Sequence, residues 1–448
     1  MGILKPKEVG SGLLATALLW SLMLGWWLAD GQNPTPAELL VDLGVLPLIL
    51  IGGFFLLRGV VGQRLAPWPG PAPALPPAGS AGLAQAAFVG VCRQVVVPEG
   101  DLALNLLDAF VVAPGGRSGA ALLSAIASGR GARLRRLEGA GGPPGVAEVE
   151  GLDVGAFAER LQSGVPAQEA WLASDELLRS LALLDAVLGD AVARLEGLAG
   201  ASRLPVRCVC LVPAHWEAAH YPWLHGWLQR TYLAGFAPGR CELSLVPVAD
   251  GPAALAYVDE LCLALNREPG AGRLVLLASA VSALDRRILA GWAARHPGGQ
   301  RPGECAAALL LTRAGRVPQL PVAEGAVAQI GRLVVSPRGG GAEADDQFPG
   351  RLGGVPPGGL VCDGAHLAAG GAAFPATLAH LDPRHDCLAT GSVVGLAPPA
   401  GALVALACAA SRVGAGPVLC LSIPHEHRWA ALPVRPLAVA SPAAPLRT

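Results

Sequence analysis

Residues 206–214 read VRCVCLVPA, and four further segments follow in regular alternation: YPWLHGWLQRTYLAG (221–235), LSLVPVAD (243–250), GPAALAYVDELCLALNR (251–267) and RLVLLASAVSA (273–283). The first, third and fifth segments are short and almost continuously apolar, which is typical of strands that are covered on both faces. The second and fourth predict helices. Strands that alternate with helices in this way predict an α/β fold.

The alternation continues to residue 436, and further elements are predicted before residue 206. Upstream, AFVGVCRQVVV (87–97) predicts a buried strand and GAALLSAIASG (119–129) a short helix, while residues 168–198 predict two helices separated near Gly189. The predicted downstream elements are a helix at 285–296, strands at 306–313 and 358–366, a helix at 395–414, and strands at 417–427 and 430–436.

The composition excludes several classes of protein. Of 448 residues, 52% are hydrophobic and only 15% are charged, which excludes a disordered chain. Lysine and arginine total 33 against 34 aspartates and glutamates, so no basic surplus exists to bind nucleic acid. Lysine occurs only at Lys5 and Lys7, so the rest of the chain offers no Schiff-base or P-loop lysine.

Two apolar stretches predict a transmembrane hairpin within residues 1–65. They read GLLATALLWSLMLGWWLA (12–29) and LGVLPLILIGGFFLL (43–57), and each is close to the length that a helix needs to cross a bilayer. Lys5 and Lys7 precede the first stretch, arginines follow the second, and the connecting loop carries only acidic charge. The positive-inside rule then predicts a hairpin in a bacterial inner membrane with both termini in the cytoplasm.

Changes in composition divide the rest of the chain. Residues 66–80 (APWPGPAPALPPAGS) are rich in proline and predict an extended, semi-rigid linker. We expect an N-terminal α/β-helical region at 81–200, a core domain at 201–436 and a flexible tail at 437–448. None of the ten cysteines forms a CxxC pair and several lie in apolar segments, so we expect buried thiols and no disulfide framework.

Two segments of the core domain resemble the thiolase-like superfamily, and the β-ketoacyl synthases in particular. PGECAAALLL (302–311) is similar to the G-E-G-A-A segment of that family, with Cys305 in place of the second glycine. GLVCDGAHL (359–367), together with residues 389–436, is similar to the family's small-residue loop, the helix behind the active site and two closing strands. The resemblance covers roughly residues 204–436. It implies a thiolase-like layered fold, and a homodimer, because these folds usually pair across a central strand.

The positions that carry the chemistry of this family differ here. Ketosynthases hold the acyl group on a cysteine at a strand-to-helix turn, which the resemblance places at Gly251. The first family histidine belongs in an H-G-T-G-T turn, where this chain reads CDGAH (362–366). The second belongs in GLAPPAG (395–401), which has no histidine, and the family's lysine has no counterpart. The resemblance therefore implies the fold without its catalytic residues, and no cofactor.

A second interpretation keeps acyl chemistry but assigns it to other residues. Cys305 with His366 would then be the nucleophile and the base. A third interpretation is a binder of acyl chains or acyl carriers that uses the family's substrate tunnel without turnover. The candidate pocket residues are Glu304, Cys305, Asp363, His366, His385, Cys387, His425 and His427.

Three other groups of residues carry chemistry that bears on function. His215, His220 and His225 recur every five residues and share no helical face, so we expect no metal site. The four arginines within residues 130–136 are either a solvated loop or a contact for anionic lipid heads. The aromatic residues within 216–236 are either core or a docking surface.

From the sequence we expect a membrane-anchored, cytoplasmic pseudo-ketosynthase that acts as a protein-binding or adaptor module. The fold pattern, the altered catalytic positions and the membrane tether motivate this expectation. One setting for such an adaptor is a bacterial secretion system, such as a type VI-like one. The alternatives are an acyl-group transferase with relocated residues, and a binder of acyl chains or acyl carriers.

Overall fold

The computed structural model describes most of the second half of the chain and part of the first. The predicted hairpin, the linker, the strand at 87–97, most of the helix at 285–296 and the tail beyond residue 437 lie outside the described residues. Among the described helices, none has both the length and the apolar character needed to span a bilayer. The described residues belong to one compact unit, residues 93–448. They are 102–135, 145–162, 174–268, 272–284, 289, 292, 301–314, 327–335, 355–364, 378, 380–382, 385–414, 416–425 and 428–437.

Five strands form the first half of the sheet. They lie side by side in the order β5 (Cys241–Val248), β4 (Val206–Pro213), β6 (Leu274–Ser282), β7 (Glu304–Arg313) and β1 (Leu104–Val112). β4 is parallel to both β5 and β6. β7 is antiparallel to both β6 and β1.

The second half repeats this pairing pattern. Its strands follow in the order β11 (Cys387–Ala389), β10 (Gly359–Cys362), β12 (Val418–His425), β13 (Arg428–Arg435) and β8 (Ala328–Ile330). β10 is parallel to β11 and β12, whereas β13 is antiparallel to β12, β8 and the short β9 (Val334–Val335). β8 also pairs with β1, which joins the halves into one mixed sheet. The predicted α/β class is confirmed.

Two helices fill the central core between the inner faces of the half-sheets. They are α8 (Gly251–Arg267) and α13 (Ala400–Arg412), and both pack with strands of each half. α13 is buried on all sides from Ala400 to Ala410. Its residues there are small or aliphatic, as a helix that is enclosed by other elements requires.

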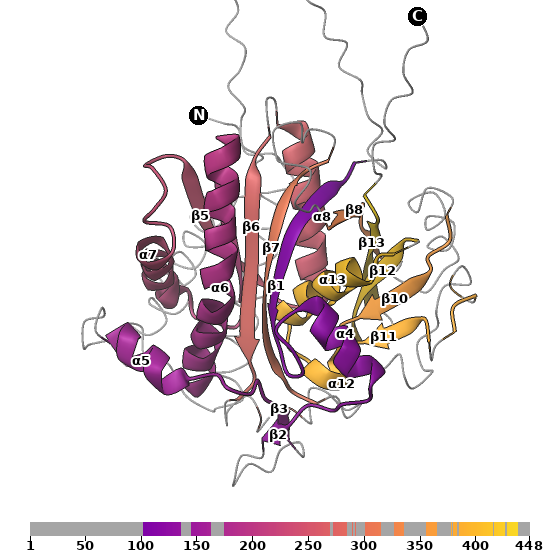
Figure 1. Ribbon diagram of the computed structural model, residues 1–448. Helices are drawn as coiled ribbons and strands as arrows, with labels where there is room; N and C mark the ends of the chain where they lie inside the picture. Colours follow the sequence, from indigo (N-terminus) through magenta and orange to yellow (C-terminus); the bar gives the residue numbers. More distant parts are fainter. Residues whose placement is uncertain are drawn as a thin grey trace, which may run out of the picture. The chain divides into compact units, whose positions relative to one another are not determined.

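A long helix, α6 (Asp175–Ser202), covers the outer face of the first half-sheet and runs along β6 (Figure 1). Neighbouring residues of β7 face opposite sides, so Cys305 lies in the central core and Ala306 packs in the outer core with α6. The predicted break near Gly189 is wrong, because α6 is a single helix of 28 residues. Glycine costs a helix about 1 kcal/mol, and packing against three strands outweighs that cost here.

Shorter elements complete the described fold. The predicted helices at 119–129 and 221–235 correspond to α4 (Gly119–Ala127) and α7 (Tyr221–Thr231). A third apolar cluster covers the outer face of β10 and β12. The remaining elements are β2 (Leu134–Arg135), β3 (Val146–Ala147), α5 (Val154–Gln162), η4 (Ala218–His220) and α12 (Gly391–Val394).

Candidate functional site

Gly251, where the resemblance places the family's cysteine, is the first residue of α8. The helix begins here because the Asp250 side chain accepts a hydrogen bond from the backbone N of Ala253 at 2.9 Å. Pro252 suits the first helical turn, where its missing N–H costs no hydrogen bond. Since β5 ends at Val248, Gly251 lies at a strand-to-helix turn.

The space beside Gly251 is already filled. An ideal Cβ at this position would overlap Oγ of Ser422 and the carboxylate oxygen Oδ2 of Asp363. Asp363 directly follows β10 and Ser422 lies in β12, and these strands are parallel neighbours with Cys362 opposite Leu421. The two side chains therefore meet at one edge of the sheet, although they are 59 residues apart in the chain.

Asp363 and Ser422 form a buried hydrogen-bonded pair. Oγ of Ser422 donates to Oδ2 of Asp363, and the backbone N of Ile423 donates to Oδ1 at 3.0 Å. Burial raises the pKa of Asp363 to about 6, although these two hydrogen bonds act in the opposite direction, and the nearby Asp250 raises it further. The site therefore holds a carboxyl group that titrates close to neutral pH.

Cys305 is the second residue of β7 and is completely buried. Burial is the main cause that raises the pKa of its thiol, and the charges of Glu304 and Asp363 add to it. Because the thiolate is the reactive form of cysteine, this environment favours a protonated and enclosed thiol.

Glu304 faces the opposite side of β7 from Cys305 and holds the end of α6 on the sheet. Arg179 of α6 donates two hydrogen bonds to it, from Nε to Oε2 at 2.9 Å and from Nη2 to Oε1 at 2.7 Å. Oγ of Ser282 and the backbone N of Val149 each donate a further bond at 2.7 Å. With four donors, the Glu304 carboxylate is fully engaged in structural contacts.

The structure brings Asp363 to Gly251, and the charge of Asp363 also acts on the thiol of Cys305. His385 is largely exposed, and its Nε2 lies 4.0 Å from Oδ2 of Asp382. Cys387 is half-buried in the edge strand β11. The structure does not describe the side chains of His366, His425 and His427.

The histidines and aromatic residues near α7 have structural contacts. Nε2 of His215 lies 2.6 Å from Oε1 of Glu176, which also accepts a bond from Nε1 of Trp216 at 3.2 Å. Trp216 and Trp227 are buried in the outer core, which supports the core interpretation of the aromatic segment. Within the described part of the chain, no three acidic, thiol or imidazole groups are arranged to bind a metal ion.

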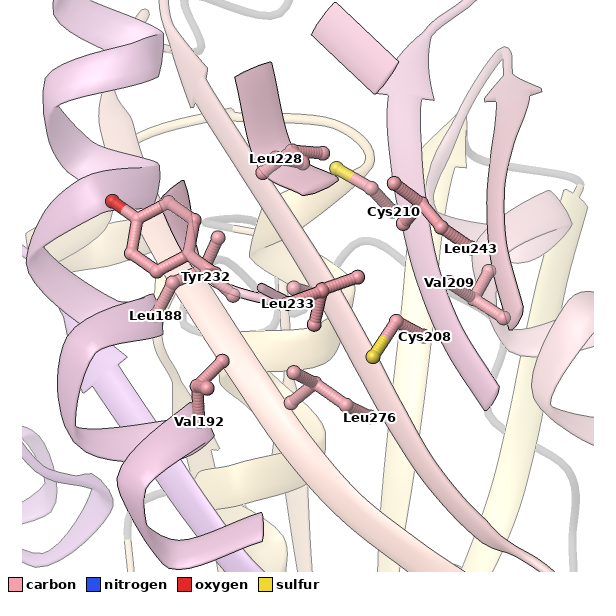
Figure 2. A pocket seen from close by; sticks show the side chains of 11 residues that line it. Leu188, Val192, Cys208, Val209, Cys210, Leu228, Tyr232, Leu233, Leu243 and Leu276 are labelled. Carbon is pink, nitrogen blue, oxygen red and sulfur yellow. The ribbon is translucent and has the colours of Figure 1, made fainter. Parts of the chain in front are cut away.

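A small apolar cavity lies between α6, α7 and the outer face of β4 (Figure 2). Its free volume is about 20 Å³, which is room for about one water molecule. Leu188, Cys208 and Tyr232 are among the lining residues, and Sγ of Cys208 lies 3.6 Å from Sγ of Cys241. Cys208 and Cys210 both face this side, as their alternate spacing predicts, and both are buried.

Comparisons with known proteins identify the fold. No protein-family model and no curated protein sequence matches the chain. The structure of the ishigamide ketosynthase/chain length factor is similar with 16% identity and a TM-score of 0.51, over 75% of this chain and 100% of that chain. The ketosynthase complex AntDE:AntF has 11% identity and a TM-score of 0.48, over 75% of this chain and 99% of that chain. OleA from Xanthomonas campestris, bound with cerulenin, has 11% identity and a TM-score of 0.41, over 76% of this chain and 100% of that chain.

The described part of the chain therefore has the thiolase-like α/β fold that ketosynthases share. The similarity extends further than the sequence indicates. Residues 204–436 are only about half of the chain, so a match over 75% includes residues before 204. This agrees with β1 and α6, which come before residue 204 and pack directly on β7.

Proposed function

We propose that this chain is a pseudo-ketosynthase, a thiolase-like protein that binds other proteins and does not condense acyl groups. The contact of Gly251 with Asp363 and Ser422 carries this proposal. A condensation needs a nucleophile that carries the acyl group and donors that stabilise the enolate and the oxyanion. Gly251 offers no nucleophile, and an ionised Asp363 beside it would repel the negative charge that develops during the reaction.

The two alternatives have less support. An enzyme that used Cys305 would need an accessible, ionised thiol, whereas this thiol is completely buried and its pKa is raised. For a binder of acyl chains, the apolar cavity beside α7, with a free volume of about 20 Å³, is too small to hold a chain. A binding role for the folded surface is consistent with both observations.

Acyl loading tests the absence of chemistry. The purified full chain is incubated with malonyl and long-chain acyl thioesters, and intact-mass spectrometry measures covalent adducts. We expect no adduct in the wild type or in Cys305→Ala. An adduct that disappears in Cys305→Ala would favour the relocated enzyme, and one that persists would reveal another nucleophile. Either result contradicts the proposal.

We propose that two copies of the chain pair through the outer edge of β5. β5 ends the sheet and pairs only with β4 among the described strands. An edge strand keeps backbone donors and acceptors available to another strand. Light scattering should give twice the mass of the chain, and hydrogen exchange of the β5 amides should slow as the concentration rises. A monomer at every concentration contradicts this part of the proposal.

We also propose that residues 12–29 and 43–57 anchor the protein in the inner membrane, with the thiolase-like part in the cytoplasm. The support is the apolar length of these stretches and the basic residues outside them. A green fluorescent protein fused after Thr448 should fluoresce in cells, and alkaline phosphatase fused there should be inactive. The opposite pattern would place the C-terminus in the periplasm and contradict the proposed topology.

A further inference from the structure

A polar cavity lies beside α4, at the same end of the sheet as Gly251. Strands β5, β4 and β6 all end where β7 begins, and β1 ends there as well before the chain enters α4. The cavity has a free volume of about 360 Å³, which is within the size range of small-molecule sites. Its charged lining residues are Arg117, Arg130, Arg133, Glu148 and Glu150.

The three arginines of this cavity have little internal compensation. The side chains of Arg117 and Arg133 make no hydrogen bond or ion pair with any residue that the structure describes. The side chain of Arg130 makes a single hydrogen bond, from Nε to Oγ of Ser128 at 3.0 Å. The three side chains are exposed, so water screens much of their mutual repulsion, and a bound anion relieves the remainder.

The acidic lining residues neutralise only part of this charge. Oε1 of Glu148 is already held by Nη1 of Arg135 at 2.9 Å and lies 3.3 Å from Nη2 of Arg179. Glu150 has no ion pair within the described residues and contributes one negative charge. Among the lining residues that the structure describes, three arginine charges less the charge of Glu150 leave a surplus of two positive charges.

We infer that this cavity binds a phosphate monoester. Such a group carries a charge of about −1.5 to −2 at neutral pH, which matches the surplus better than a single carboxylate does. The guanidinium group donates paired N–H bonds in a planar fork that fits the oxygens of a phosphate. Gly131, another lining residue, is exposed and has nothing within 4 Å of its Cβ direction, so the cavity is open to solvent on this side. The inference does not depend on the proposed loss of catalysis.

A soluble metabolite and a lipid headgroup offer the same phosphate chemistry, so the test compares both. Isothermal titration calorimetry of the purified full chain uses three probes at constant ionic strength: inorganic phosphate, glycerol 3-phosphate and water-soluble dihexanoyl phosphatidic acid. The double variant R117A/R133A should bind each probe at least about tenfold more weakly, because it loses two charge-assisted donors. Glu150→Gln should bind about twofold to tenfold more tightly, because it removes the opposing negative charge.

Arg230→Ala is the matched control. Arg230 is an exposed arginine of α7 whose side chain has no hydrogen bond or ion pair with the described residues, and its loss should leave the affinity unchanged. Equal binding of glycerol 3-phosphate and phosphatidic acid supports a soluble ligand at this site, and tighter binding of phosphatidic acid supports a lipid headgroup.

Three results would overturn the inference: no binding to the wild type, unchanged binding in R117A/R133A, or equal weakening in the Arg230→Ala control. The gain of affinity in Glu150→Gln separates a real site from a variant that has simply unfolded. An acyl adduct in the thioester experiment would contradict the proposed function and leave this site unaffected.

Discussion

Replacing Asp363 by asparagine should stabilise the protein at neutral pH and remove a pH dependence that the wild type has. The asparagine keeps both contacts of the carboxylate, because its oxygen accepts from the backbone N of Ile423 and its NH₂ group donates to Oγ of Ser422. The substitution removes the negative charge, which burial disfavours.

The magnitude follows from the pKa of this carboxyl. Its pKa is about 6 in the folded protein against an ordinary value of 3.8. Between these values the folded state holds the proton that the unfolded state has released, so stability falls as the pH rises through this window. A difference of about two pKa units corresponds to about 3 kcal/mol, and the wild type loses this amount in full above about pH 7.

Urea unfolding of the full chain between pH 4 and pH 8 measures this effect. As the pH rises from 4 to 8, the free energy of unfolding of Asp363→Asn should increase by about 2–3 kcal/mol relative to that of the wild type. Asp190→Asn removes an exposed aspartate of α6 and controls for the loss of one charge, with an expected change within about 0.5 kcal/mol. Parallel stability curves for the wild type and Asp363→Asn would refute the reasoning, because the carboxyl could then not titrate differently on folding.

Three further substitutions or measurements test the surrounding structure. Gly251→Ala should lower the free energy of unfolding by about 1–3 kcal/mol, because its Cβ collides with the neighbouring pair; unchanged stability in urea would show that the space is free. Glu304→Gln should cost about 2–3 kcal/mol, because the largely buried guanidinium of Arg179 loses the closer of its two charged partners and keeps only Glu148; a thermal midpoint equal to that of the wild type would contradict this. Cys241 should react with iodoacetamide before Cys305, because Cys241 is half-buried and a hydrogen bond with a neighbouring thiol lowers its pKa; peptide mapping that gives equal rates would argue against the enclosure of Cys305.

The sequence predicts best those strands that are almost continuously apolar. β4, β6 and β7 are buried on both faces, so each appears as a largely apolar run of nearly the correct length. β1 was not predicted, because Asn105 and Asp108 interrupt its apolar residues. It becomes a strand through pairing with β7, about 200 residues later in the chain, and a local pattern does not contain that information.

The candidate site was predictable only in part. The resemblance identified Gly251, and Asp363 was among the pocket candidates, but Ser422 was missed. A signal for Ser422 exists, because both it and Asp363 follow apolar runs at the same end of two strands. The pairing of those strands was needed to bring the two residues together. Similarly, Arg117 precedes α4 and Arg130 and Arg133 follow it. All three line one cavity because both ends of this helix lie beside it.

The identities of Gly251 and Asp363 depend on each other, because the two residues occupy adjoining space. The first turn of a helix carries a partial positive charge that favours an anion, although at Asp363 burial outweighs this effect and raises the pKa. In ketosynthases, as the resemblance implies, this position serves the catalytic thiolate. Here the carboxylate of Asp363 lies against the same turn of α8, and only glycine leaves room for it. A cysteine at position 251 would displace the Asp363–Ser422 pair, and an adjacent carboxylate would raise the pKa of its thiol. A nucleophile at position 251 would therefore be poorly activated for as long as Asp363 remains, and this coupling supports a binding role over a condensing one.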